Sequence, residues 1–258
     1  MRREGLGARV RVRGNRWLLV GAALTAWGIT ACAGTGGRTP GPPAASSSPG
    51  AASTASIEPG PPLSAQALKA IALTGDDVAG TPYISLDVRS PDDPDSNFPP
   101  ASDATCQTLL DAVDANDAAT AVDQNINWLD SIWPGGATLA SYAGTGAEKA
   151  FDRARTSLTT CHDFTGVGFT GKYAAHVEPE KIPHLGDESI AFRITVPVKQ
   201  APGLRSGRRV SLRNEQHILV RVGGVTGYFT MLAMDRKDPF PLALVEREVA
   251  RMTKAQQA

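Results

Sequence analysis

Residues 218–232 read ILVRVGGVTGYFTML, and this stretch decides the fold class. Apolar side chains lie on both sides of Gly223-Gly224, and a glycine pair between two such runs is typical of a tight β-hairpin turn. The earlier stretch 190–198, IAFRITVPV, places large apolar side chains at every second position, with the period of a strand. The C-terminal half of the chain is therefore expected to form neighbouring antiparallel strands.

Helices are expected on both sides of these strands in the sequence. Apolar positions at helical spacing predict four of them, beginning near Ser64, at Ser102 or Asp103, at Thr145 and at Pro241. The third opens with Thr145-x-x-Glu148, the pattern of a capping box. One strand is predicted over residues 83–89, and the sequence leaves room for one more between the second and third helices. Four strands are expected after the third helix.

Strands that cluster in the sequence, with helices at both ends, predict an α+β fold. We expect a single, mostly antiparallel β-sheet packed against helices on one face, with part of the other face open. A ligand could dock on that open face or at its edge. Residues 63–258 have a suitable length for one domain, and no second linker or internal repeat interrupts them.

The N-terminus has the three regions of an export signal. Six arginines lie within the first 16 residues, an apolar stretch follows at 17–31, and Ile29-Thr30-Ala31-Cys32 resembles the bacterial lipobox. As a helix the apolar stretch would rise about 22 Å, short of the roughly 30 Å hydrocarbon core of a bilayer. The resemblance implies that residues 1–31 are a signal peptide and that Cys32 becomes the lipid-bearing first residue. An ordinary signal peptide or an uncleaved anchor is the alternative, and Arg2-Arg3 leaves the export route open.

Residues 32–62 are expected to form a lipidated cysteine followed by a disordered tether. The stretch is rich in Gly, Pro, Ser and Ala, and Ile57 is its one aliphatic side chain larger than alanine. Such a composition buries too little apolar surface to offset the chain entropy lost on folding. We therefore expect the domain to stand away from the extracytoplasmic face of the membrane.

Charge and composition exclude one class of partner. Without residues 1–31 the chain has 20 basic and 25 acidic residues, and a mildly acidic protein is a poor partner for nucleic acid.

The amino-acid composition also indicates a source. Abundant Ala, Gly, Pro, Ser and Thr, with scarce lysine, are typical of a protein from a high-GC actinobacterium.

Two cysteines remain once Cys32 is assigned to lipid. An even pair in an oxidising compartment favours a disulfide, so Cys106 and Cys161 are expected to be bonded. The bridge would join the second helix to the end of the third. A catalytic or metal-binding role for Cys161 would need a partner such as His162, but neighbours in sequence point apart.

Three short stretches partly match the sequence patterns of phosphate-binding or metal-binding sites. Residues 166–171 match G-x-G-x-x-G, but no helix follows to present its amides to a phosphate, so a glycine-rich turn is predicted. His176, Glu178, Glu180 and His184 could form a metal face, yet two prolines break the segment and a solvated strand end is preferred. The acidic loop at 92–103 lacks the spacing of a calcium site. We predict no metal and no cofactor.

Trp128 and Trp133 bracket an apolar loop, NWLDSIWP. They could line a ligand groove, although a place in the core or in a packed loop is the preferred interpretation. No G-x-S-x-G elbow or other catalytic signature is present after Cys32, so we expect no enzyme.

The domain resembles secreted actinobacterial lipoproteins whose sensor-type domain is similar to the extracellular sensor domain of PknH-type serine/threonine kinases. The features that carry the resemblance are the D-D-V-A-G turn at 76–80, the cysteine-headed helix at Cys106, Cys161 after the next helix and the strand-rich tail. That family has two disulfides, and this chain can form one. The resemblance implies a non-catalytic ligand-binding or sensor-like domain at the cell envelope, which binds a small molecule or an envelope protein. An assembly protein without a small ligand is the first alternative, and a hydrolase of envelope polymers is the second.

Overall fold

The computed structural model describes residues 60–78, 84–89, 98–129, 131–168, 171–199 and 210–257. The expected signal peptide, Cys32 and nearly all of the expected tether lie outside these residues. Residues 52–258 form one compact unit, and every residue of its hydrophobic cores lies between Leu63 and Met252. This unit is therefore expected to fold without the residues before it.

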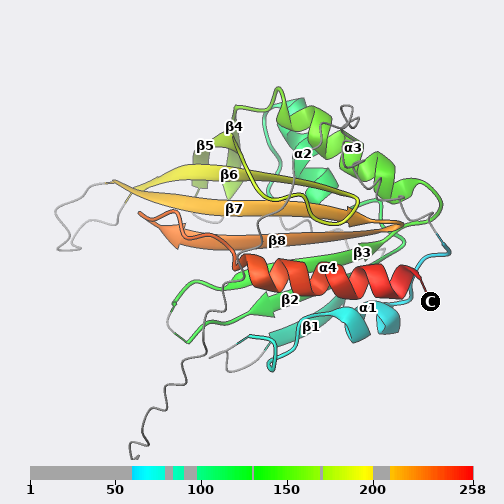
Figure 1. The fold of residues 1–258 in the computed structure, drawn as a ribbon. Helices are drawn as coiled ribbons and strands as arrows, with labels where there is room; N and C mark the ends of the chain where they lie inside the picture. The colour runs from blue at the N-terminus through cyan, green and yellow to red at the C-terminus, as the bar shows by residue number, and fades with distance from the viewer. Residues whose placement is uncertain are drawn as a thin grey trace, which may run out of the picture. The chain divides into compact units, whose positions relative to one another are not determined.

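One eight-stranded antiparallel sheet carries four helices in the part of the chain that is described (Figure 1). The helices are α1 (Ala65–Ile71), α2 (Ala104–Val113), α3 (Gly146–Leu158) and α4 (Leu242–Gln256). The strands are β1 (Ile84–Arg89), β2 (Thr120–Ile126), β3 (Gly135–Ser141), β4 (Asp163–Gly168), β5 (Gly171–Glu180), β6 (Glu188–Lys199), β7 (Val210–Val222) and β8 (Val225–Met234). Their order across the sheet is β1-β2-β3-β8-β7-β6-β5-β4. The α+β class and the single antiparallel sheet are confirmed.

The strands before α3 meet the C-terminal hairpin in the middle of the sheet. The β7–β8 hairpin turns at Gly223-Gly224 as predicted, with Gly223 at a φ of 54°. β8 then pairs with β3, so Ala137 lies opposite Phe229 across a long separation in sequence. β2 and β3 are two strands where the sequence left room for one, and five strands follow α3 where four were expected.

The helices divide into two pairs on opposite faces of the sheet, a detail that differs from the expected single covered face. Val220 and Phe229 belong to the core under α1 and α4, whereas Leu219 and Tyr228 belong to the core under α2 and α3. Side chains of adjacent strand residues point to opposite faces, so the two cores lie on different sides. We call these sides the α4 face and the α2 face.

The helix ends follow the sequence signals in part. Ser64 caps α1 by accepting from the amide of Ala67, and Asp103 caps α2 by accepting from the amide of Cys106. Thr145 precedes α3, but its side chain makes no capping hydrogen bond, so the predicted capping box is not formed. The helix still begins there because its apolar stripe is buried against the sheet.

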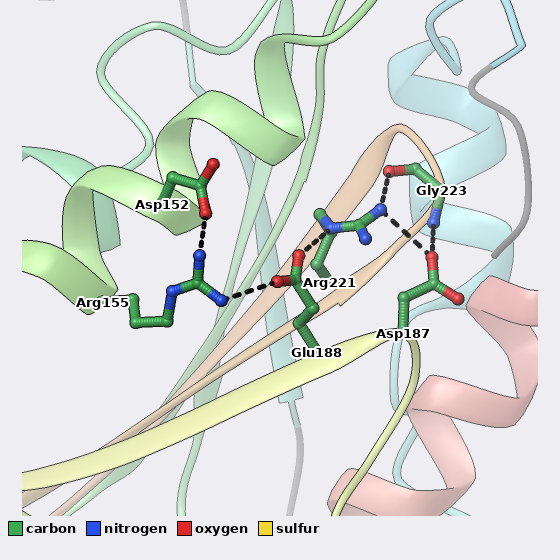
Figure 2. A network of polar contacts seen from close by, with 6 residues as sticks. All are labelled: Asp152, Arg155, Asp187, Glu188, Arg221 and Gly223. Carbon is green, nitrogen blue, oxygen red and sulfur yellow. Dashed lines mark hydrogen bonds and ion pairs between the residues drawn. The ribbon is translucent and has the colours of Figure 1, made fainter.

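An ionic network joins α3 to the strand ends (Figure 2). Its members are Asp152, Arg155, Asp187, Glu188, Arg221 and Gly223. The nearly buried guanidinium of Arg221 lies 2.7 Å from Glu188 and 3.1 Å from Asp187. Arg155 of α3 reaches Glu188 at 3.3 Å. Arg155 adds a partly exposed link between α3 and the start of β6, whereas the buried apolar stripe of the helix holds it on the sheet.

Candidate functional site

The α2 face is hollowed where α2 and α3 do not cover it. The cleft has a volume of about 1440 Å³ and is lined by every strand and by residues 98–102, which lead into α2. Its floor is the sheet itself, and one wall is the segment before α2. The cleft therefore lies on the part of the sheet that the helices leave open.

One end of the cleft is polar. Its floor there is formed by β1, β2, β3 and β8, with Asp87, Asp123, Asn125, Thr138 and Thr230. The strand register places Asp87 opposite Asp123, and Asp123 opposite Thr138. Alternation explains the polarity, because these residues face away from the core that their strand neighbours form with α1 and α4.

The charge of Asp123 is already balanced within the protein. Arg89 binds both of its carboxylate oxygens, at 2.7 and 3.1 Å, and the Thr138 hydroxyl donates to it at 2.7 Å. Asp87 and Asn125 are exposed on the same floor. This end therefore offers carboxylate, amide and hydroxyl groups, while Arg89, its nearest cation, is held by an acid.

The other end of the cleft is largely apolar, although Lys172, Arg213 and Glu215 also belong to its lining. Its lining includes Phe98, Pro99, Pro100, Phe164, Tyr173, Ile194, Val196 and Val198. The ring of Tyr173 lies against Gly166, where an added Cβ would collide with the phenol. This close contact explains a glycine at that position of β4 and keeps the ring at the edge of the cleft.

An aromatic stack lies between the two ends. The His217 ring stacks on Phe192 with centroids 4.8 Å apart, and its Nδ1 lies 2.6 Å from the Tyr228 hydroxyl. Burial, with the positive charges of Arg193 and Arg213, lowers the pKa of His217 to about 3. The imidazole is therefore neutral at physiological pH and too weakly basic for general-base work near pH 7.

The other nitrogen of His217 points toward an acid. Its Nε2 lies 3.9 Å from the nearer oxygen of Glu215 and has no hydrogen-bond partner in the described part of the chain. Burial raises the pKa of Glu215, while Arg213 at 3.2 Å opposes this shift. These groups suit hydrogen bonding to a bound molecule better than proton transfer to one.

The cysteines expected to pair are joined in the structure. Cys106 of α2 and Cys161, which follows α3, form a disulfide with their Cα atoms 4.9 Å apart. Two hydrogen bonds between Ser102 and Thr165 attach the segment before α2 to β4. The bridge and these bonds together hold the wall of the cleft in place.

The glycine-rich stretch belongs to a hairpin. β4 ends at Gly168, which pairs with Gly171 at the start of β5. No helix follows that could present amides to a phosphate, as the sequence predicted. Asp103 of the acidic loop serves as a helix cap, and residues 92, 93 and 95 lie outside the described residues.

The possible metal face has other partners. His176 lies 2.9 Å from Asp163, Glu178 lies 3.4 Å from Lys237, and Glu180 binds Arg193 at 2.5 Å. No group of three or more His, Cys, Asp or Glu residues suited to a metal ion occurs among the residues that the structure describes.

The two tryptophans lie in the β2–β3 loop. Trp128 packs edge-on against Phe240 and belongs to the α4-face core, as the preferred interpretation had it. Trp133 is partly exposed, and neither ring lines the cleft.

Sequence reasoning missed the polar floor. The pattern of 120–126, TAVDQNI, does alternate, with Val122 and Ile126 buried and Asp123 facing the cleft. Gln124 obscured the alternation, because it is polar but buried on the apolar side, where it binds Glu248. A buried polar partner of this kind leaves no local signal in the sequence.

The fold and the cleft define an α+β domain with one open, partly polar sheet face. No protein-family model matches the chain, and no curated protein matches it either. Among solved structures, the chain is similar to the extracellular domain of PknH from Mycobacterium tuberculosis, with a TM-score of 0.50 and 11% sequence identity. The match covers 76% of this chain and 97% of the other. At this identity the likeness concerns the fold.

None of the described helices combines the length and the apolar character that crossing a bilayer requires.

Proposed function

We propose that this protein is a lipoprotein of the cell envelope whose extracytoplasmic domain binds a ligand in the cleft of the α2 face and acts as a sensor-like, non-catalytic module. The observation that carries the proposal is the cleft itself, a hollow of about 1440 Å³ with polar groups at one end and apolar groups at the other. Ligand sites are typically concave, apolar in large part and furnished with a few placed polar groups.

Three further observations support the location and the role. The lipobox-like residues ending at Cys32 imply an anchor, which the chain's long polar tether would separate from the domain. The disulfide is typical of an oxidising compartment. The fold is similar to that of an extracellular domain. Under this proposal the protein binds the membrane through Cys32 and presents the cleft outside the cell.

The experiment compares residues 52–258 with a variant whose cleft is filled. Asn125→Trp places an indole on the polar floor at an exposed position, and Lys149→Trp on the exposed surface of α3 is the matched control. Each protein is incubated with an envelope extract of the host, repurified and examined by native mass spectrometry. We expect a bound small molecule on the wild type and on the control, and its loss from Asn125→Trp. Equal occupancy of all three would exclude the cleft.

An interaction role without a small ligand is the second candidate. It is favoured by the β2–β3 loop, where Leu129 and Ile132 are 73% and 87% exposed. Exposed apolar groups of this size mark interaction sites when they cluster. A wild-type protein that carries no small molecule, but loses a protein partner in Leu129→Ser/Ile132→Ser, would favour this role.

A further inference from the structure

We propose that the cleft takes an amphipathic ligand, a lipid-like molecule whose polar end carries hydroxyl groups. This inference rests on the proposed ligand-binding function and adds the chemical class of the ligand. It depends on how the two ends of the cleft differ and on how they are connected.

The polar end is suited to hydroxyl groups. A hydroxyl both donates and accepts, so it can satisfy the carboxylate of Asp87, the amide of Asn125 and the hydroxyl of Thr230. An anionic phosphate would instead require available cations. The cation next to this floor, Arg89, is held by Asp123 through two hydrogen bonds.

Gly136 makes the middle of the polar floor low. It lies between Asn125 and Thr230 in the strand register and places no side chain on the floor. An added Cβ would come within 3.2 Å of the Thr230 methyl group. A ring-sized polar group can therefore approach the backbone of β3.

The apolar end is suited to a hydrocarbon chain. Val196, Val198 and Phe164 line it, together with Tyr173 and the Pro99-Pro100 pair. The charged groups at this end are Arg213, which lies opposite Val196 and 3.2 Å from Glu215, and the exposed Lys172. Burying an alkyl chain against these side chains stabilises the complex by roughly 0.8 kcal/mol for each methylene removed from water.

The length of the cleft suits one elongated molecule that carries both parts. Six strand spacings separate β1, which carries Asp87, from β5, which carries Tyr173. At about 4.8 Å each they span roughly 29 Å. The volume of about 1440 Å³ exceeds the usual upper value of roughly 1,000 Å³ for the site of a drug-sized ligand. His217, Phe98 and Tyr228 connect the two ends with an uncharged aromatic surface.

The test uses three probes of defined structure and isothermal titration calorimetry on residues 52–258. Dodecyl maltoside, below its critical micelle concentration, has both parts of the proposed ligand. Maltose has the hydroxylated part alone, and dodecyl-dimethylamine oxide has the same alkyl chain without hydroxyls. We expect dodecyl maltoside to bind at least about tenfold more tightly than either of the others, because it alone gains the contacts of both ends.

Variants at each end identify where the parts bind. Asp87→Ala/Asn125→Ala should weaken dodecyl maltoside by about tenfold and leave the amine oxide unchanged. Val198→Asn should weaken both alkyl probes. Lys149→Trp, on α3, is the control and should change neither.

The outcomes separate this inference from the proposed function. Binding of maltose as tight as that of dodecyl maltoside, equal binding of the two alkyl probes, or no binding of any probe would overturn the amphipathic ligand. A cleft-bound peptide recovered from the envelope extract would overturn it as well. In each case the proposed function would stand if the small molecule carried by the wild type were absent from Asn125→Trp. It would fall if Asn125→Trp carried that molecule as the wild type does.

Discussion

Replacing Glu248 with glutamine should stabilise the protein at neutral pH and remove much of the pH dependence of its stability. Glu248 lies fully buried on the sheet-facing side of α4, and its Oε1 accepts a 2.5 Å hydrogen bond from the side-chain amide of Gln124 on β2. Its other oxygen has no hydrogen-bond partner among the described residues. Burial raises the pKa of Glu248 to about 8, and the hydrogen bond from Gln124 opposes the shift.

The magnitude follows from the two pKa values. The carboxyl group titrates near 4.5 in the unfolded chain and near 8 in the folded one, so folding takes up a proton between these pH values. The contribution of Glu248 to stability is therefore full below pH 4.5, falls by about 1.4 kcal/mol per pH unit as pH rises, and levels off above pH 8. Glutamine keeps the acceptor and never ionises. At pH 7 the variant should be more stable than the wild type by roughly 3 kcal/mol.

The assay is urea unfolding of residues 52–258 at pH 5, 7 and 8, followed by circular dichroism. Glu246→Gln is the matched control, because Glu246 lies on the same helix but is exposed. The free energies of unfolding of wild type and Glu248→Gln should differ by under about 1 kcal/mol at pH 5 and by roughly 3–4 kcal/mol at pH 7 and 8, while the control follows the wild type. If the free energy of unfolding changed with pH in the same way for Glu248→Gln and the wild type, the buried carboxyl group of Glu248 would not be neutral as inferred.

Two further predictions concern the supports of the cleft and of α3. Cys106→Ala/Cys161→Ala should lower the free energy of unfolding by about 4 kcal/mol, since the bridge closes a loop with a sequence separation of 55; a denaturant midpoint equal to that of the wild type under non-reducing conditions would contradict this. Arg221→Met should cost about 3–5 kcal/mol, because it leaves two acids without their nearly buried cation. Arg155→Met should cost under about 1 kcal/mol, because that side chain is 57% exposed. Equal losses for the two arginine variants, measured by urea unfolding, would show that the network of Figure 2 does not depend on Arg221.

The local elements of this protein could be predicted from the sequence alone. The Gly223-Gly224 hairpin, the helix cap at Asp103 and the alternation along β6 depend on residues within a few positions of one another. Periodicity and turn chemistry are visible at that range. The lipobox-like pattern ending at Cys32 is equally local, and the export signal stays a prediction. The pairing of Cys106 with Cys161, expected from an even number of remaining cysteines, is present in the structure.

The tertiary structure decided where these elements lie and what they form together. The pairing of β3 with β8 joins distant parts of the chain, and it places Thr138 beside Tyr228 and so builds the polar floor next to the aromatic stack. The division of the helices between two faces leaves that floor uncovered. Burial of Gln124 against Glu248 concealed the alternation of β2. A cleft is made by side chains from different strands, and their proximity is set by long-range packing, which no local pattern in a single sequence encodes.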